Sequence, residues 1–283
     1  MTTTASSAGH CLVLRLAGPL QSWGGASMFN RRDTQPEPTK SGLIGLLAAA
    51  QGRRRTDPIE DLLELTFGVR TDQPGTLLRD YHTVSDYRGR PLPSAAVSAK
   101  GMQKPTSPAK HTHITERYYL QDAVFVVAVH APDPLLAALA DAVSVPAFPL
   151  ALGRRSCPPT HPLLLPPPGG GSGPGWAGSP LEVLAAVPWQ ASRAHRDRLA
   201  NLKPQPRTID LPVSVDDPQG EDVRRDLPAS SLPGAPASFD PRHRAFTSRR
   251  VRQGWVQLPA PWPVDPATAD APAAHDPFAL LGW

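Results

Sequence analysis

Proline divides this sequence of 283 residues into two unequal parts. Of its 36 prolines, 11 precede Val145 and 25 follow it. Proline fixes φ and removes a backbone donor, so it interrupts helices and central strands. We therefore expect residues 1–160 to form a packed domain and residues 161–283 to form a Pro/Gly-rich region with a few short strands. The composition of residues 166–175 is typical of a linker or loop.

The charge follows the same division. Residues 1–160 hold 17 Lys+Arg and 13 Asp+Glu, whereas residues 161–283 hold 12 of each. The net charge of +4 therefore lies in the first part, which permits an acidic partner. Two cysteines, Cys11 and Cys157, are too few for a disulfide framework or a zinc site, so we expect a reducing, cytoplasmic location. No targeting signal and no run of ~20 apolar residues is present, so we expect no membrane partner.

Strand and helix signals alternate along the first part. Thr39, Asp57 and Asp133 are expected N-caps, and Gly52 is suited to follow the end of the first helix. The predicted strands are 11–16, 76–84, 117–131 and 149–153, and the predicted helices are 39–50, 57–67 and 133–142. This order predicts an α+β class fold with a ferredoxin-like β-α-β-β-α-β unit. A polar hairpin is inserted at about residues 85–116.

The second part has weaker signals. A short helix is expected to begin at Ser179-Pro180 and to reach Val187. Residues 207–215 and 249–258 are predicted to be paired strands, and the remainder to be irregular.

The amino end of the 39–50 helix is a candidate phosphate site. It places Lys40, the Ser41 hydroxyl and free backbone N–H groups, including that of Gly42, where the helix dipole is positive. The spacing of a Walker A loop is absent, so nucleotide hydrolysis is not supported. The alternative is an ordinary capped helix whose Gly42 and Gly45 allow close packing on the sheet.

The predicted hairpin is cationic. Residues 76–120 hold seven basic and three acidic residues, and the basic ones are Arg79, Arg88, Arg90, Lys100, Lys104, Lys110 and Arg117. A long cationic hairpin of this kind is typical of proteins that bind a sugar–phosphate backbone in a groove. Arg31-Arg32 and Arg154-Arg155 supply further positive charge. The alternative is a solvated loop with scattered surface charge.

Histidines and a tryptophan offer further candidates. His82, His111 and His113 lie near a lysine and tyrosines and have the groups needed for acid–base cleavage of RNA, although passive contact with phosphate is the favoured interpretation. The nearby groups are Tyr81, Lys110, Tyr118 and Tyr119. No Cys/His cluster predicts a metal site. Trp23 is able to stack on a base or to fill the core; we favour the core, with Gln21 and Ser22 positioning the loop.

Six segments, taken in chain order, resemble the CasD family of the type I-E CRISPR Cascade complex, within the RAMP superfamily. The first runs from Leu14 to Gly24 (LRLAGPLQSWG), and the third from Pro38 to Ala48 (PTKSGLIGLLA). The others are Arg32 with Thr34, Asp80 to Thr83 (DYHT), Arg117 to Ala123 (RYYLQDA) and Leu152 to Pro158 (LGRRSCP).

The resemblance implies a modified RRM-type fold in which residues 85–116 form a β-hairpin thumb that kinks the RNA between its handle and spacer. It implies a non-catalytic subunit of an antiviral ribonucleoprotein complex, without a cofactor, that holds the 5′ handle of the CRISPR RNA. The expected partners are the backbone subunit CasC, the large subunit CasA and, through the complex, target DNA. The residues expected to bind RNA are Gln21, Ser22, Arg31, Arg32, Lys40, Ser41, Gly42, His82, Lys100, Lys104, Lys110, Arg154 and Arg155.

An alternative function comes from relatives in type I-C systems, which process precursor CRISPR RNA with Tyr, Lys and His side chains. By that likeness the chain is a metal-independent endoribonuclease, with His111, Lys110 and His82 as catalytic residues.

Overall fold

The computed structural model describes residues 9–25, 30–86, 99–100, 102, 111–169, 175–232 and 236–262. Its larger sheet has seven strands: β1 (His10–Ala17), β4 (Thr66–Gln73), β7 (Val124–His130), β8 (Trp176–Ala177), β9 (Thr208–Asp216), β10 (Asp222–Ser230) and β11 (Arg244–Pro259). Their order is β10-β11-β9-β4-β7-β1-β8, and neighbouring strands are antiparallel. The chain therefore has a mixed α+β fold with a mainly antiparallel sheet.

Apolar side chains cover both faces of the centre of this sheet. On one face, Leu12, Leu14 and Leu16 of β1 pack in a core with helices α1 (Lys40–Ala50), α2 (Glu60–Leu63) and α3 (Asp133–Ser144). On the other face, Cys11 and Val13 pack in a core with α4 (Pro180–Ala186) and the inner faces of β9 and β11. Strand β7 is buried on both faces, which explains its continuous apolar sequence.

Two of the predicted helix starts are confirmed in detail. The Thr39 side chain accepts a hydrogen bond from the backbone N–H of Gly42, and α1 ends before Gly52, which has φ +78°. Ser179 and Glu182 form the capping box of α4. A further short helix, α5 (Arg193–Ala200), was not predicted; its N-cap is Ser192.

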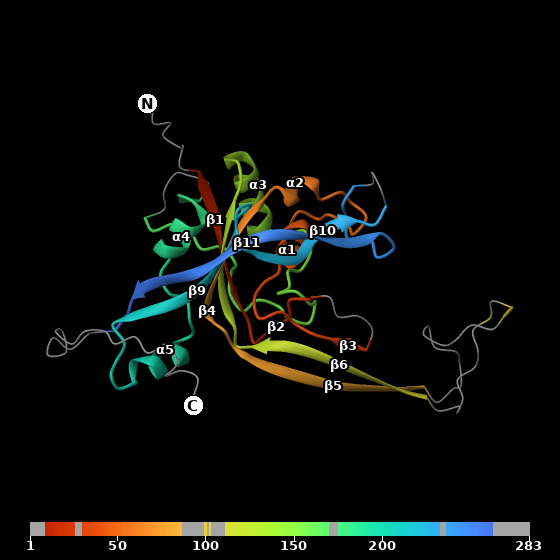
Figure 1. The fold of residues 1–283 in the computed structure, drawn as a ribbon, viewed down its shortest axis with the longest axis horizontal. Helices are drawn as coiled ribbons and strands as arrows, with labels where there is room; N and C mark the ends of the chain where they lie inside the picture. Colours follow the sequence, from red (N-terminus) through yellow and green to blue (C-terminus); the bar gives the residue numbers. More distant parts are fainter. Residues whose placement is uncertain are drawn as a thin grey trace.

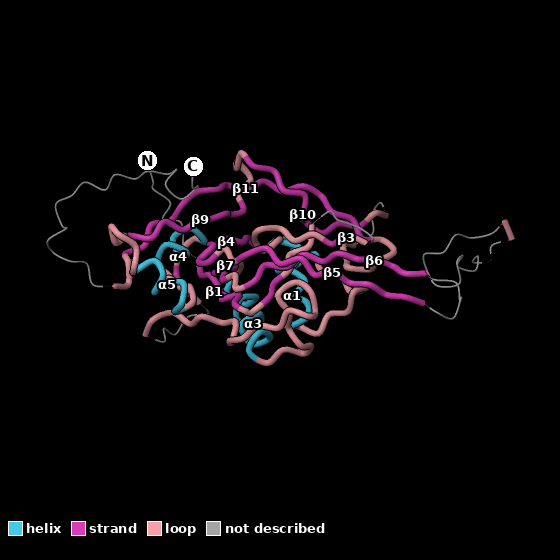
Figure 2. Tube along the Cα trace, turned by 90° about the horizontal axis from the view of Figure 1, so that it is seen from below, coloured by secondary structure: helices cyan, strands magenta, loops and turns pink. Residues whose placement is uncertain are grey.

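The smaller sheet carries a long hairpin that projects from the body of the molecule (Figures 1 and 2). Strands β5 (Thr76–Asp86) and β6 (His111–Gln121) pair antiparallel along their full length. Two short strands border β6: β2 (Leu20–Gln21) runs antiparallel to it and β3 (Arg31–Arg32) runs parallel. The tip of the predicted insertion, residues 87–98, 101 and 103–110, lies outside the described residues.

The predicted helix over residues 57–67 is wrong for most of its length. Only α2 is helical, its N-cap is Ile59, and the Asp57 carboxylate accepts a bond from the backbone N–H of Arg54. Phe67 belongs to β4, a strand that was not predicted because most of its residues are polar.

A buried ion pair explains why β4 accepts polar residues. Arg70 and Asp72 are almost completely enclosed, and the guanidinium donates two hydrogen bonds, 2.6 and 2.9 Å long, to the carboxylate. Arg70 also donates to the carbonyl oxygens of Val187 and Pro188, at 2.7 and 3.1 Å, and to that of Leu184. The pair therefore attaches the end of α4 to the central sheet.

Three other local predictions need correction. The predicted strand 117–131 is divided between the two sheets at Asp122, where φ is +56°, a conformation that Asp tolerates. Residues 149–153 form no strand and lie in a loop. Helix α3 begins where predicted, but Pro132 is its N-cap and the Asp133 carboxylate lies 3.0 Å from His10 Nδ1.

The second part of the chain continues the sheet of the first. Strand β9 pairs with β4 and also with β11, as predicted for residues 207–215 and 249–258. Strand β10 was not predicted. The division into domains at residue 160 stays a prediction. Among the described residues, no helix is both long enough and apolar enough to cross a membrane.

We expect Arg70→Met to lower the free energy of unfolding by about 3–5 kcal/mol, because it leaves the Asp72 carboxylate buried without its partner. The control is Arg193→Met, which breaks an exposed pair with Asp197 and should cost less than about 0.5 kcal/mol. Urea unfolding of the two variants measures the difference. Equal losses would show that the buried pair has no special role.

Candidate nucleic-acid interface

The smaller sheet brings the Arg31-Arg32 pair onto the side of the hairpin. In the parallel pairing of β3 with β6, Arg31 lies opposite Glu116 and Arg32 opposite Arg117. Arg31 is exposed, donates to Asp33 at 2.9 Å and has its guanidinium carbon 5.1 Å from the centre of the Tyr118 ring. A cation at this distance from an aromatic face is attracted to it, so the ring orients the arginine.

Arg154 reaches β6 from a loop that follows Arg32 by 122 residues, and it contacts the ring on the other face of the strand. Its guanidinium carbon lies 4.9 Å from the centre of the Tyr119 ring. It donates hydrogen bonds to the carbonyl oxygens of Arg32, at 2.8 Å, and Tyr118, at 3.3 Å. Arg155, the next residue, is exposed. The two arginine pairs predicted to bind RNA therefore come together at β6 through Arg31, Arg32 and Arg154. We call Arg31, Arg32, Arg117, Arg154 and Arg155 the β6 arginine cluster.

Buried polar residues hold this surface in place from below. The Gln21 amide donates to the carbonyls of Leu16, at 3.1 Å, and Ala123, at 2.7 Å, and accepts from the Trp23 indole at 3.2 Å. The Ser22 hydroxyl donates to the Tyr118 carbonyl at 3.0 Å.

These contacts correct part of the predicted RNA-binding set. Gln21 and Ser22 are 0% and 1% exposed, so the geometry does not fit direct RNA contact by either side chain. They position the loop and strand that carry the arginines. Trp23 is fully buried, which confirms its predicted place in the core.

A glycine lets the Arg154 loop approach β2 closely. The Ser22 N–H donates to the Leu152 carbonyl at 3.1 Å. Gly153 has φ +86°, and a Cβ built there would lie 1.9 Å from the Ser22 carbonyl oxygen. Only glycine fits both the backbone conformation and the contact. Gly153 therefore sets where Arg154 leaves the loop.

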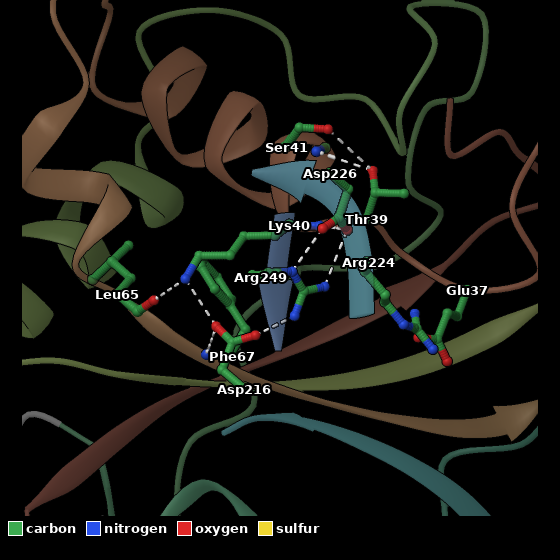
Figure 3. Close-up of polar contacts among 11 residues, drawn as sticks. Glu37, Thr39, Lys40, Ser41, Leu65, Phe67, Asp216, Arg224, Asp226 and Arg249 are labelled. Carbon is green, nitrogen blue, oxygen red and sulfur yellow. Dashed lines mark hydrogen bonds and ion pairs between the residues drawn. The ribbon is translucent and has the colours of Figure 1, made fainter. Parts of the chain in front are cut away.

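The amino end of α1 is occupied by the protein itself (Figure 3). Lys40 is 7% exposed, and its ammonium donates to the Leu65 carbonyl at 2.7 Å and to the Asp216 carboxylate at 2.8 Å. The backbone N–H of Lys40 donates to Asp226 at 2.9 Å. The cation and the first free N–H of the helix thus already have anionic partners.

Arg249 completes this buried network. Its guanidinium donates to Asp226 at 2.7 and 3.0 Å and pairs with Asp216 (Figure 3). Beside it, Arg224 pairs with Glu37. We call Lys40, Asp216, Asp226 and Arg249 the α1 ion network.

The predicted phosphate site at Lys40, Ser41 and Gly42 does not fit this arrangement. Lys40 would have to leave two bonds to reach a phosphate, and Ser41 is 7% exposed. Gly42 lies against Trp23, since an added Cβ would be 2.8 Å from the indole. The geometry fits the alternative of a capped helix packed closely on the core.

The hairpin carries the other candidates at its surface. His82 is exposed, and its Nδ1 lies 3.0 Å from the Thr115 hydroxyl. Lys100 is exposed, whereas Lys104 and Lys110 lie outside the described residues. The backbone of His111 pairs with Asp86, four positions from the pairing of His82 with Thr115. At ~3.3 Å per residue, His82 and His111 are about 13 Å apart along the hairpin.

Both cysteines of the chain are buried. Burial raises the pKa of the Cys11 thiol to about 12 and also raises the pKa of Cys157, so neither supplies a thiolate at neutral pH. In the part of the chain that the structure describes, no three His, Cys, Asp or Glu residues are grouped so as to hold a metal ion.

Sequence reasoning missed the structural role of two aromatic residues. Tyr118 and Tyr119 were associated only with the histidines, but their rings hold Arg31 and Arg154 in place. Their position next to Arg117 was the available signal. The residue that each ring contacts depends on the strand pairing, which the sequence does not display.

Comparison with known proteins identifies the family. The family described as CRISPR-associated protein (Cas_Cas5) matches residues 11–252 of this chain. The chain belongs to this family. The β6 arginine cluster and its supports are built from segments that carry the resemblance to CasD, since residues 14–24, 117–123 and 152–158 meet there with Arg32.

Individual relatives agree with the Cas_Cas5 assignment. The protein "CRISPR system Cascade subunit CasD" of Escherichia coli (strain K12) is 40% identical over 173 residues, which are 54% of this chain and 69% of that protein. A solved structure titled "CRISPR RNA-guided surveillance complex" contains a chain with 37% identity and a TM-score of 0.66, covering 88% of this chain and 91% of that one. A "Crystal structure of Cas protein" has 33% identity and a TM-score of 0.58, covering 88% and 95%.

We expect Gly153→Ala to destabilise the fold by about 1–3 kcal/mol more than Gly169→Ala. Both glycines have positive φ, so both variants carry the cost of a left-handed alanine, but an added Cβ at Gly169 meets nothing within 4 Å. The additional loss reports the collision with Ser22. Urea unfolding of both variants measures it, and equal losses would contradict the close approach.

Proposed function

We propose that this chain is a non-catalytic subunit of a Cascade-type complex that binds CRISPR RNA and holds its 5′ handle in antiviral defence. The observation that carries the proposal is the convergence of the β6 arginine cluster on one strand. Its five arginines outnumber the neighbouring carboxylates, Asp33, Asp80 and Glu116, so the surface is positively charged. A phosphate backbone is an anion that several neighbouring arginines suit.

The relatives support the biological setting. The protein similar in sequence is named as a Cascade subunit, and one similar chain comes from an RNA-guided surveillance complex. By this likeness the partners are CRISPR RNA, the backbone subunit CasC and the large subunit CasA, with target DNA reached through the complex.

The fold supports a RAMP-type protein. The strand order β4-β7-β1-β8, with α1 and α3 in the connections, is the one expected of a ferredoxin-like unit. We propose that the β5–β6 hairpin is its thumb. Tyr81 on β5 is 55% exposed and Leu77 is 65% exposed, so the hairpin offers apolar and aromatic surface on which bases can stack.

The geometry favours binding over catalysis. Acid–base cleavage needs a base and an acid within hydrogen-bond reach of one phosphate. In the described part of the hairpin, His82 bonds to Thr115, and the backbone of His113 pairs with Val84 two positions further along. Arg31 and Arg154, in contrast, are each held by a tyrosine ring, and Arg154 also by two bonds to backbone carbonyls, as a rigid binding surface requires.

We expect the double variant Arg154→Gln, Arg155→Gln to bind the chain's own CRISPR repeat RNA about tenfold more weakly at low salt. The slope of log K against log [salt] should fall by roughly 0.7 for each RNA phosphate that the variant no longer neutralises. The control is Arg252→Gln on β11, which removes an exposed arginine paired with Asp217 on the other sheet. A gel-shift salt series with the purified full-length chain measures both quantities.

The same gel tests the absence of catalysis, because cleaved RNA migrates separately from shifted RNA. Intact RNA throughout is the expected result. Equal affinity of the double variant and wild type would contradict the binding surface. A discrete product formed without metal, and lost in His111→Ala, would instead identify the endoribonuclease alternative.

A further inference from the structure

A cavity of about 550 Å³ opens at the body end of β6, beyond the arginine cluster. One wall is the turn from Asp122 to Val124 and the end of β1. The opposite wall is the beginning of α5, and residues Thr160 and His161 close one side. Its volume lies within the range of pockets that hold small molecules.

Two arginines line the cavity. Arg15 and Arg198 are joined in the lining by His161 and His195, and Asp122 is the only carboxylate among the lining residues. Burial, followed by the charge of Arg198, lowers the pKa of His195 and so favours its neutral imidazole. The two guanidinium groups outnumber the single carboxylate, and this balance of charge favours an anion.

Arg15 has a donor that lacks a partner. Its Nε is enclosed and has no hydrogen-bond acceptor among the described residues. Burial, and then the charge of Arg196, lowers the pKa of Arg15. Asp72 has the opposite effect on that pKa, but its carboxylate already accepts from Arg70 and from the N–H of Gln190. An enclosed guanidinium N–H without an acceptor is costly. Because the Nε is closed to solvent, an anion in the cavity would meet Arg15 through the other nitrogens of its guanidinium.

The wall formed by α5 is held in position. The Gln73 side-chain oxygen accepts from both the N–H and the hydroxyl of Ser192, at 3.1 and 2.9 Å. The Trp189 ring packs edge-on against His195 with 5.8 Å between centres. Arg198 lies 2.7 Å from His195 Nδ1, which orients its guanidinium. Arg198 is therefore positioned before any ligand arrives, as tight binding requires.

We propose that this cavity binds a phosphate group carried by a nucleotide. Guanidinium groups match the geometry of phosphate, and the cavity has room for an attached nucleoside. The phosphate comes either from a free nucleotide or from a bound RNA strand. The second source rests on the proposed function, in which RNA binds the β6 arginine cluster. The cavity is close enough for the same strand to reach, because Asp122 in its lining follows β6 directly and is about 17 Å from Arg117 at ~3.3 Å per residue.

The test is calorimetric titration of the full-length chain with AMP, and with adenosine as the probe that lacks phosphate. Wild type should bind AMP saturably in the millimolar range or tighter, and adenosine at least tenfold more weakly. Arg198→Gln and Arg15→Gln should each weaken AMP binding at least tenfold. The matched control is Arg193→Gln on the same helix, which lies outside the cavity lining and should change AMP binding less than twofold. Because Arg198 is exposed, its variant is expected to fold even if Arg15→Gln does not.

RNA binding separates the two sources. If RNA supplies the phosphate, RNA displaces AMP and Arg198→Gln weakens RNA binding; if a free nucleotide does, Arg198→Gln loses AMP and keeps RNA. Absent AMP binding, equal binding of adenosine, or equal effects of Arg193→Gln and Arg198→Gln would overturn the site. The Arg154→Gln, Arg155→Gln double variant tests the β6 surface separately. Absence of AMP binding therefore leaves the proposed RNA-binding function unaffected, and loss of that function leaves the test of the AMP site unaffected.

Discussion

Two largely buried carboxylates, Asp216 and Asp226, hold the first and second parts of the chain together. Asp216 binds the Lys40 ammonium, Asp226 binds the first N–H of α1, and Arg249 bridges them. Buried charges of this kind are stable only when every partner is present. Strands β9, β10 and β11 therefore complete the packing of α1, and α1 in turn covers the core on which the smaller sheet is placed.

The elements that sequence reasoning found are those with local signals. Helix starts can be predicted from capping residues, because a cap depends only on neighbours within one turn. Thr39 caps α1 in this way, and Ser179 with Glu182 caps α4. Strand β4 was missed because its Arg70 and Asp72 look exposed in the sequence, and only their mutual pairing makes them compatible with the core. The break at Asp122 was missed because apolar residues continue on both sides of it.

The sequence identified the basic residues of the candidate surface, and the structure shows how they are arranged. Both arginine pairs were recognised as basic, and the structure adds that β3 and the Arg154 loop meet on β6. Lys40, with the same charge, has a different role because Asp216 lies beside it, 176 positions further along the chain. Sequence proximity to a helix end could not reveal a partner at that separation. Gln21 and Ser22 have the positioning role favoured from their sequence rather than the RNA contact implied by the resemblance, since each donates to a carbonyl that is 102 or 96 positions away.

The long-range character of the α1 ion network has a consequence for synthesis on the ribosome. Lys40 leaves the ribosome 176 residues before Asp216, and at about 5–20 residues per second this interval is roughly 9 to 35 s. Throughout that interval neither Asp216 nor Asp226 has been synthesised. The first N–H of α1 and the Lys40 ammonium therefore lack the carboxylates that they bind in the folded chain. The nascent first part consequently keeps this end of the helix hydrated until β9 emerges. Final compaction of the chain is thus a late event, tied to the appearance of its proline-rich second part.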